Sequence, residues 1–265
     1  MAYWKDFYEF LNSNEYEYKW AGNYGAKGEK RAPKTKPTPE QIKKQNQKNR
    51  ENRVRRILKA NFLVDDLWVT YKYPKGTRKT IKEVMEDMEG HRGQLRYERK
   101  KSGNPLKWIC RIEIGKQGGI HVHMVINRVR GEPTDRLIRD KWKKHGTVHF
   151  ENLHEEGGFE ALAEYIVKPP PEEMEGQLSM FTPEEKKQLV KYSCSRNLIR
   201  PKPKRKHYSH WTVRKLLLEG PKPAPGYYID KNTIVAGINK FTGMSYLRYT
   251  EVRIKPIKRE EWGGG

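Results

Sequence analysis

The sequence predicts an α+β sandwich whose antiparallel sheet leaves one face open. Residues 106–114 (LKWICRIEI) and 120–127 (IHVHMVIN) alternate between apolar and polar side chains, as strands do when one face is buried. The turn GKQGG joins them, so we expect one β-hairpin. The segment from Leu67 (LWVTYKYP) is rich in β-formers, and residues 80–100 and 158–168 have helical spacing of apolar residues, which supplies a further strand and flanking helices.

Composition divides the chain into three expected segments. Residues 26–60 carry thirteen Lys or Arg against three acids, so we expect residues 1–60 to be a basic N-terminal arm with a helix. Residues 61–172 hold the strand and helix patterns and should form the catalytic domain. Residues 186–215 hold eleven Lys or Arg and no acid, so residues 173–265 should form a basic C-terminal extension.

The charge balance indicates a polyanionic partner. The chain has 55 Lys plus Arg against 33 Asp plus Glu, a formal net charge of +22, which favours nucleic acid. We find neither an apolar run long enough for a membrane span nor a signal-peptide layout, and therefore expect a cytoplasmic protein with no membrane partner. The candidate phosphate-binding residues are Arg53, Arg55, Arg56, Lys202, Lys204, Arg205 and Lys206.

Aromatic side chains add candidates for stacking on bases. These are Tyr97, Trp108, Tyr208 and Trp211. Trp108 shares the apolar face of its strand, so for this residue we expect a core position instead.

The hairpin register predicts a metal site. If residues 115–119 form the loop, Glu113 lies opposite His121 and Arg111 lies opposite His123. Two imidazoles and a carboxylate then share the face turned away from the core, within reach of one divalent ion. A bulge in the loop would move Glu113 to the other face. The alternatives are solvated histidines without a metal, or His149 on the next short strand as a substitute ligand.

A helix over residues 158–168 carries the candidate nucleophile. Phe159, Leu162 and Ile166 form its buried stripe, and Tyr165 and Lys168 lie together on its flank. The alternative for Tyr165 is simple packing against the sheet.

Together these segments resemble a known family. GGIHVHMVI resembles the histidine-hydrophobic-histidine motif of HUH endonucleases, YIVK resembles their Tyr-x-x-Lys motif, and LWVTYKYP resembles the first motif of rolling-circle replication initiators. The resemblance covers residues 67–168 and implies a ferredoxin-like or RRM-like antiparallel sheet, with the histidines on central strands and the tyrosine on an adjacent helix. It also implies Glu113 as third ligand and Mg²⁺ or Mn²⁺ as the metal. KYSCSRNLIRP, GYYIDK and INKFTG are similar to segments of initiators from bacterial plasmids, phages and mobile elements.

The expected function is therefore that of a site-specific nickase and strand transferase. Tyr165, assisted by Lys168 and a metal held by His121, His123 and Glu113, would attack single-stranded DNA at an origin hairpin. The products would be a 5′-phosphotyrosine and a free 3′-hydroxyl, and the reverse reaction would religate the strand. One tyrosine in the motif indicates the single-tyrosine branch, with Tyr192 left open as a second acceptor.

The partners expected besides DNA are a host helicase and a polymerase. Two alternatives remain open at this point. One is a relaxase or transposase with the same chemistry, and the other is a non-catalytic protein that binds RNA or DNA on an RRM-like sheet.

Overall fold

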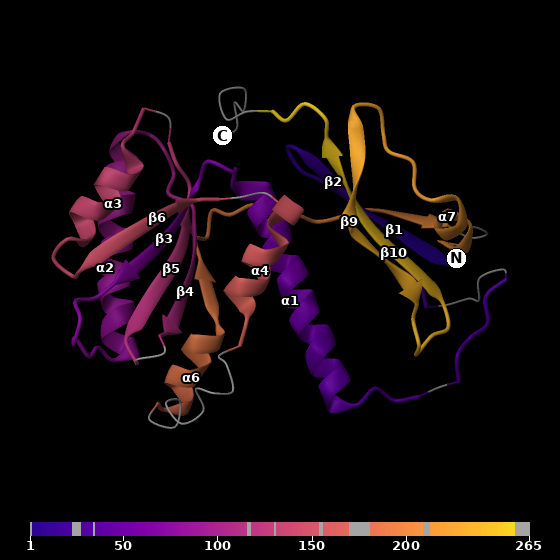
Figure 1. Cartoon of the computed structure of the whole chain (residues 1–265), viewed down its shortest axis with the longest axis horizontal. Helices are drawn as coiled ribbons and strands as arrows, with labels where there is room; N and C mark the ends of the chain where they lie inside the picture. The colour runs from indigo at the N-terminus through magenta and orange to yellow at the C-terminus, as the bar shows by residue number, and fades with distance from the viewer. Residues whose placement is uncertain are drawn as a thin grey trace. The chain divides into compact units, whose positions relative to one another are not determined.

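The computed structural model describes residues 2–22, 28–33, 35–115, 118–129, 131–153, 156–169, 181–208 and 213–257. The chain divides into two compact units, a central unit of Arg50–Ile199 and a terminal unit of residues 1–49 with 200–265. In chain order (Figure 1) the elements are β1 (Tyr3–Glu9), β2 (Ser13–Trp20), α1 (Pro39–Asn61), β3 (Leu67–Lys72), α2 (Ile81–Lys101), β4 (Trp108–Ile114), β5 (Ile120–Ile126), α3 (Thr134–Trp142), β6 (Thr147–Asn152), the 3₁₀ turn η1 (Glu156–Phe159), α4 (Glu160–Val167), α6 (Pro183–Val190), β7 (Tyr192–Cys194), β8 (Lys204–Tyr208), α7 (Val213–Glu219), β9 (Tyr227–Ile238) and β10 (Ser245–Arg253).

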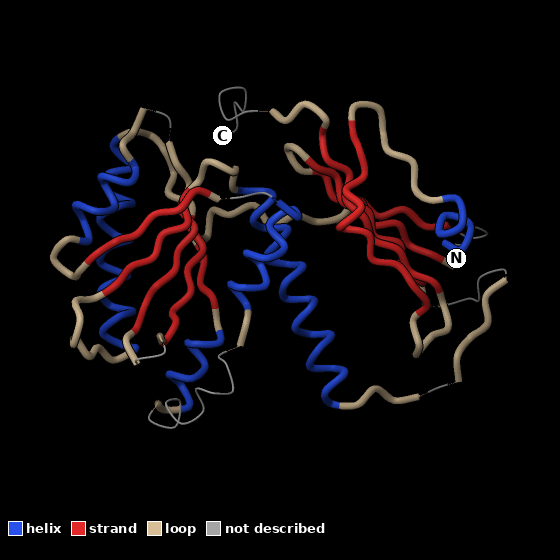
Figure 2. Tube along the Cα trace, in the orientation of Figure 1, coloured by secondary structure: helices blue, strands red, loops and turns tan. Residues whose placement is uncertain are grey.

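The central unit is built on a five-stranded antiparallel sheet. Its strand order is β6-β3-β5-β4-β7, so the predicted hairpin of β4 and β5 is flanked by β3 and β7. Figure 2 shows α2 and α3 along one side of these strands. The α+β class that the sequence predicts is confirmed.

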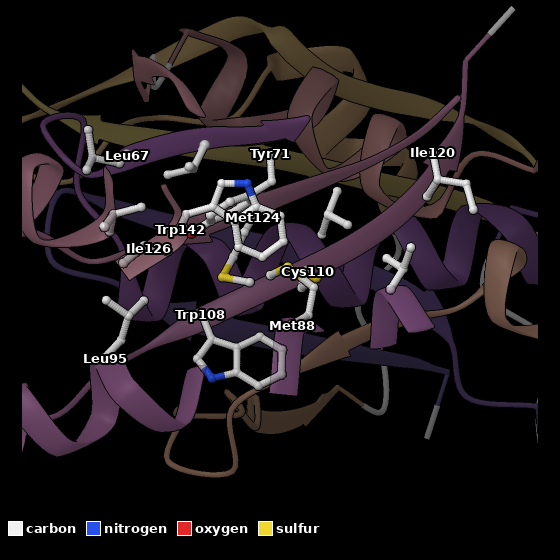
Figure 3. Close-up of a cluster of buried hydrophobic side chains, with 14 of the residues drawn as sticks. Leu67, Tyr71, Met88, Leu95, Trp108, Cys110, Ile120, Met124, Ile126 and Trp142 are labelled. Atoms are coloured by element: carbon white, nitrogen blue, oxygen red, sulfur yellow. The ribbon is translucent and has the colours of Figure 1, made fainter. Parts of the chain in front are cut away.

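The apolar strand positions face α2 and α3 and form the main core. Because side chains alternate along a strand, every second residue of β3, β4 and β5 points into this layer. Figure 3 shows Leu67, Tyr71, Met88, Met124 and Trp142 in the cluster. Trp108 is also part of it, so the core position predicted for this residue is confirmed.

The opposite face of the sheet is partly covered, whereas the sequence led us to expect an open face. Ile109 and Val125, which lie opposite each other on β4 and β5, pack against Val54 of α1 and Ile166 of α4. Apolar contacts with two helices stabilise this arrangement because they remove the otherwise exposed strand residues from water. The other end of the hairpin remains accessible on this face.

Helix ends follow from local sequence signals. Thr80 caps α2, since its hydroxyl accepts from the Glu83 N–H at 3.2 Å and the Glu83 carboxylate accepts from the Thr80 N–H at 2.8 Å. Among the described helices, including α1 and α2, none has the length and apolar character that crossing a bilayer requires.

The terminal unit is a second antiparallel sheet, of order β8-β1-β2-β10-β9. Its strands come from both ends of the chain, because β1 pairs with β2 and β8, and β2 pairs with β10. This differs from the arm and extension that we expected for residues 1–60 and 173–265. The N-terminal strands contain alternating aromatic residues that need a partner sheet, and Tyr3 and Tyr18 are buried there beside Val213 of α7.

Gly146, which precedes β6, provides a test of the strand packing. A Cβ at this position would lie 2.0 Å from the carbonyl oxygen of Lys72 on the adjacent strand, and that backbone atom cannot move aside. We expect Gly146→Ala to lower the free energy of unfolding by about 2 kcal/mol or more. Gly90 within α2 has no atom near its Cβ position, so Gly90→Ala should stabilise by roughly 0.5–1 kcal/mol. Urea unfolding followed by fluorescence compares the two, and equal midpoints would contradict this account.

Candidate active site

The register of β4 and β5 is the predicted one. Ile114 lies opposite Ile120, Glu113 opposite His121 and Arg111 opposite His123. The pairing has no bulge from Ile114 back to Trp108, and the Gly115 N–H donates to the Gly119 carbonyl at 2.7 Å. The prediction that these polar residues share the face away from the main core is therefore confirmed.

Helix α4 brings Tyr165 to this face. Ala163, Ile166 and Val167 are buried against the sheet, which leaves Tyr165 half-buried on the flank of the helix. The Tyr165 hydroxyl donates a hydrogen bond to Oε2 of Glu113 and lies 3.1 Å from Nε2 of His123. The phenol is thus in direct contact with two of the predicted metal ligands.

Three neighbours hold the His123 imidazole in place. Its Nε2 lies 3.0 Å from Oε2 of Glu113, and its Nδ1 lies 3.1 Å from the Thr70 hydroxyl on β3. Trp68 stacks on the imidazole, with ring centroids 5.2 Å apart and planes 9° apart, and also meets the Tyr165 ring edge-on at 5.6 Å. With both nitrogens engaged, the orientation of the ring is determined. The sequence analysis did not single out Thr70 or Trp68, although their strand period places them on this face.

Arg111 is a further site residue whose role the sequence analysis missed. It is only 5% exposed, its guanidinium donates to the backbone carbonyl of Tyr165, and its Cζ lies 5.6 Å from the centre of the Tyr165 ring. A fixed cation here both holds the end of α4 on β4 and favours negative charge on the phenol. Its place opposite His123 in the predicted hairpin was the signal that could have identified it.

The contacts shift the protonation of these groups. The hydrogen bond with His123, together with those from Tyr165 and the charge of Arg111, lowers the pKa of Glu113 to about 2. Burial, followed by the Glu113 carboxylate, raises the pKa of Tyr165 above its ordinary value, and Arg111 opposes this. Burial and the neighbouring His123 lower the pKa of His121. In this state the carboxylate is ionised and the phenol keeps its proton.

His121 lies apart from the contact between Glu113 and His123. Its ring centroid is 6.5 Å from that of His123, and its imidazole lies so close to Gly115 that a Cβ there would be 2.5 Å from Nε2. Within the described ranges, no group of three His, Cys, Asp or Glu side chains is gathered tightly enough to hold a metal ion. The three predicted ligands share one face, but in this structure only two of them touch.

A basic hollow of about 580 Å³ adjoins His121. Lys72, which lies opposite His121 on β3, lines it together with Lys75 and Arg78. A larger hollow of about 1150 Å³ lies on the other face, between α2 and β7, and contains none of the predicted catalytic or metal residues. The basic hollow beside His121 is therefore the one in position to take a phosphate at the candidate site.

The remaining predicted site residues are distributed over both units. Lys168 is exposed just beyond the end of α4, and Arg53 is exposed and Arg56 partly exposed on α1. Arg55 is 2% exposed, so its guanidinium is not available to a phosphate from solvent, contrary to the prediction from the basic run. In the terminal unit, the side chains of Lys202, Lys204, Arg205 and Lys206 are exposed, and Trp211 is outside the described residues.

The two open alternatives have distinct positions. His149 on β6 lies opposite Thr70, two strands from His123, and its exposed side chain is 3.3 Å from Glu151. Tyr192 on β7 lies opposite Arg111 and packs partly against the cluster beneath α4. Tyr192 therefore shares the face of Tyr165, while His149 is too far across the sheet to join Glu113.

Comparison with known proteins points to a class of DNA-replication proteins. Residues 66–170, which include the hairpin and α4, match the family model of replication-associated proteins of the ORF2 type. The match supports a replication initiator of the Rep type, with DNA as its binding partner. No curated protein and no solved structure matched the chain.

The low pKa of Glu113 predicts how the metal-free protein responds to acid. A carboxylate whose folded pKa is depressed contributes stability above its unfolded pKa of about 4.5, and this contribution is lost as the pH falls toward about 2. We expect the free energy of unfolding of the wild type to exceed that of Glu113→Gln most at pH 6, with a difference that narrows steadily toward pH 3. Urea titrations in chelator over this range measure it, and a difference independent of pH would contradict the assignment.

Proposed function

We propose that the chain initiates rolling-circle replication by nicking single-stranded DNA at an origin through Tyr165. The observation that carries this proposal is the contact of the Tyr165 hydroxyl with Glu113 and His123 on the accessible end of the hairpin face. A nucleophile and two acceptors for its proton lie within hydrogen-bond distance, which is the geometry that covalent catalysis needs. The match of residues 66–170 to replication-associated proteins supports the same reaction.

The proposed reaction is an exchange of one phosphodiester for another. The phenolic oxygen of Tyr165 forms a bond to the scissile phosphorus and loses its proton, while the bond to the 3′ oxygen breaks and that oxygen takes up a proton. The products are a 5′-phosphotyrosine and a free 3′-hydroxyl. Because one ester replaces another, the reverse attack by a 3′-hydroxyl religates the strand.

The chain's own residues prepare this attack. His123 is held by Thr70 and Trp68 and accepts from, or donates to, the phenol according to its tautomer. Arg111 stabilises the phenolate that forms, and Lys168 beyond α4 is available to orient the phosphate. Lys72 and Lys75 supply further positive charge in the hollow beside His121.

Glu113, His121 and His123 are the residues that would hold a divalent ion, Mg²⁺ or Mn²⁺. The donor set fits such an ion in its chemistry, since a carboxylate and imidazoles both bind these metals, and two of the three donors are already 3.0 Å apart. When bound, the ion would neutralise non-bridging phosphate oxygens.

A non-catalytic RRM-like role fits the central unit less well. Recognition on an RRM sheet uses exposed aromatic residues on an open sheet face. Here α1 and α4 cover part of that face, and its accessible end carries Glu113, His123 and Tyr165. A relaxase or transposase would use the same chemistry, and the choice of a replication initiator rests on the family match.

The nucleophile is tested by incubating the protein with origin single-stranded DNA and Mn²⁺ and resolving the products on a denaturing gel. Tyr165→Phe should lower the yield of the covalent adduct by at least ~10³-fold, because no hydroxyl remains to attack. Tyr192→Phe is the matched control and should retain adduct formation. Loss of the adduct only in Tyr192→Phe would make Tyr192 the nucleophile and reject this proposal.

The roles of Glu113 and His123 are tested by the initial rate of adduct formation. We expect His123→Ala and Glu113→Gln each to lower this rate by about 100-fold, since each removes both a contact to Tyr165 and a metal donor. His149→Ala, on the same face but two strands away, should react like the wild type. Chelator should abolish the reaction in all variants, and full activity in chelator would exclude the metal.

A further inference from the structure

One face of the terminal sheet combines aromatic rings with lysines. Residues directly opposite each other in neighbouring strands share a face. Phe7 lies opposite both Tyr16 of β2 and Lys204 of β8, and Lys5 lies opposite Lys206. Tyr16 in turn lies opposite Tyr249 of β10, so four adjacent strands contribute to one surface.

The aromatic rings on this face form a continuous floor. The ring centroids of Phe7 and Tyr16 are 5.0 Å apart, and those of Tyr16 and Tyr249 are 4.9 Å apart with planes 21° apart. Tyr249 is buried, while Phe7 and Tyr16 remain partly exposed. Helix α7 packs on the other end of the face, where Val213 contacts the cluster that contains Tyr3 and Leu247, and so leaves the Phe7 end uncovered.

Lysines border the exposed rings. The Lys5 ammonium lies 4.6 Å from the centre of the Tyr16 ring, and that of Lys204 lies 5.9 Å from the centre of the Phe7 ring. These residues, with Arg205 and Lys206, line a hollow of about 300 Å³. Lys204 also pairs with Glu9 at 2.7 Å, but both side chains are exposed, and such a pair is weak enough to yield to a phosphate.

Rings that can stack and cations at their edge are the two components of a site for single-stranded nucleic acid. We propose that this face binds single-stranded DNA, with bases against Phe7 and Tyr16 and phosphates at Lys5, Lys204 and Lys206. Double-stranded DNA does not fit, because its bases are stacked inside the duplex and cannot reach the rings. The site is outside residues 66–170 and separate from Tyr165, and the inference rests on the proposed function only for the choice of DNA over RNA.

The lysine contacts are tested by anisotropy with a fluorescent single-stranded oligonucleotide. The full chain is used in a Tyr165→Phe background without divalent metal, so that nicking does not affect the result. Lys204→Gln with Lys206→Gln should weaken binding and lower the magnitude of the slope of log K against log salt by about 1.4, or ~0.7 per phosphate contact. The control, Lys231→Gln with Lys240→Gln, removes the same charge at exposed positions at the β9 edge and should leave the slope unchanged.

Stacking is tested by Phe7→Leu, which keeps an apolar side chain but removes the ring. We expect binding to weaken roughly tenfold with an unchanged salt slope. On an oligonucleotide of abasic sites, Phe7→Leu and Phe7 proteins should bind equally, because no base is present to stack. Thermal melting establishes that the variants are folded, and the exposed lysine variants provide a readout if Phe7→Leu unfolds.

Three results would overturn the proposal. These are equal losses in the lysine variant and its control, wild-type affinity in Phe7→Leu, or a Phe7-dependent preference for RNA of the same sequence over DNA. Failure of the nicking proposal has a different signature, since the wild type would then form no adduct with Mn²⁺ while the dependence of binding on Phe7 and the lysines persisted.

Discussion

The pairing of β4 with β5 is the constraint on which the candidate site depends. Side chains alternate along a strand, so a shift of one residue would turn Glu113 and His123 toward α2 and the main core. The observed register instead places both on the face that α4 approaches. The buried alternation of Met124, Val122 and their neighbours against α2 makes that shift costly, because it would exchange apolar for charged side chains in the core.

Partial covering of this face gives the site its chemistry. The apolar contacts of α1 and α4 exclude water from the Ile109 end, and burial decreases along the hairpin toward Glu113 and His121. Tyr165 lies at this boundary, where its hydroxyl reaches Glu113 and Arg111 binds its carbonyl. Hydrogen bonds are stronger in such a partly desolvated place, yet a strand of DNA can still approach from the accessible end.

The two units present nucleic-acid chemistry in different forms. In the central unit, the polar face concentrates a phenol, a carboxylate and imidazoles, which suits bond exchange at a phosphate. In the terminal unit, the face with Phe7 and Tyr16 has rings and lysines but no such cluster among its described residues, which suits binding alone. This division gives the chain's excess of positive charge a use on both sheets.

Local patterns in the sequence determined the α+β class, the hairpin register, and the helix that presents Tyr165, because strand and helix periods depend on near neighbours. Tertiary structure alone decided the pairing of β1 and β2 with β8 and β10, since those partners are some 200 residues away and no local signal links them. It also decided the burial of Arg55 within a basic run, and the contact of Arg111 with Tyr165. These depend on which surfaces meet when helices pack on a sheet, and that is a property of the whole chain.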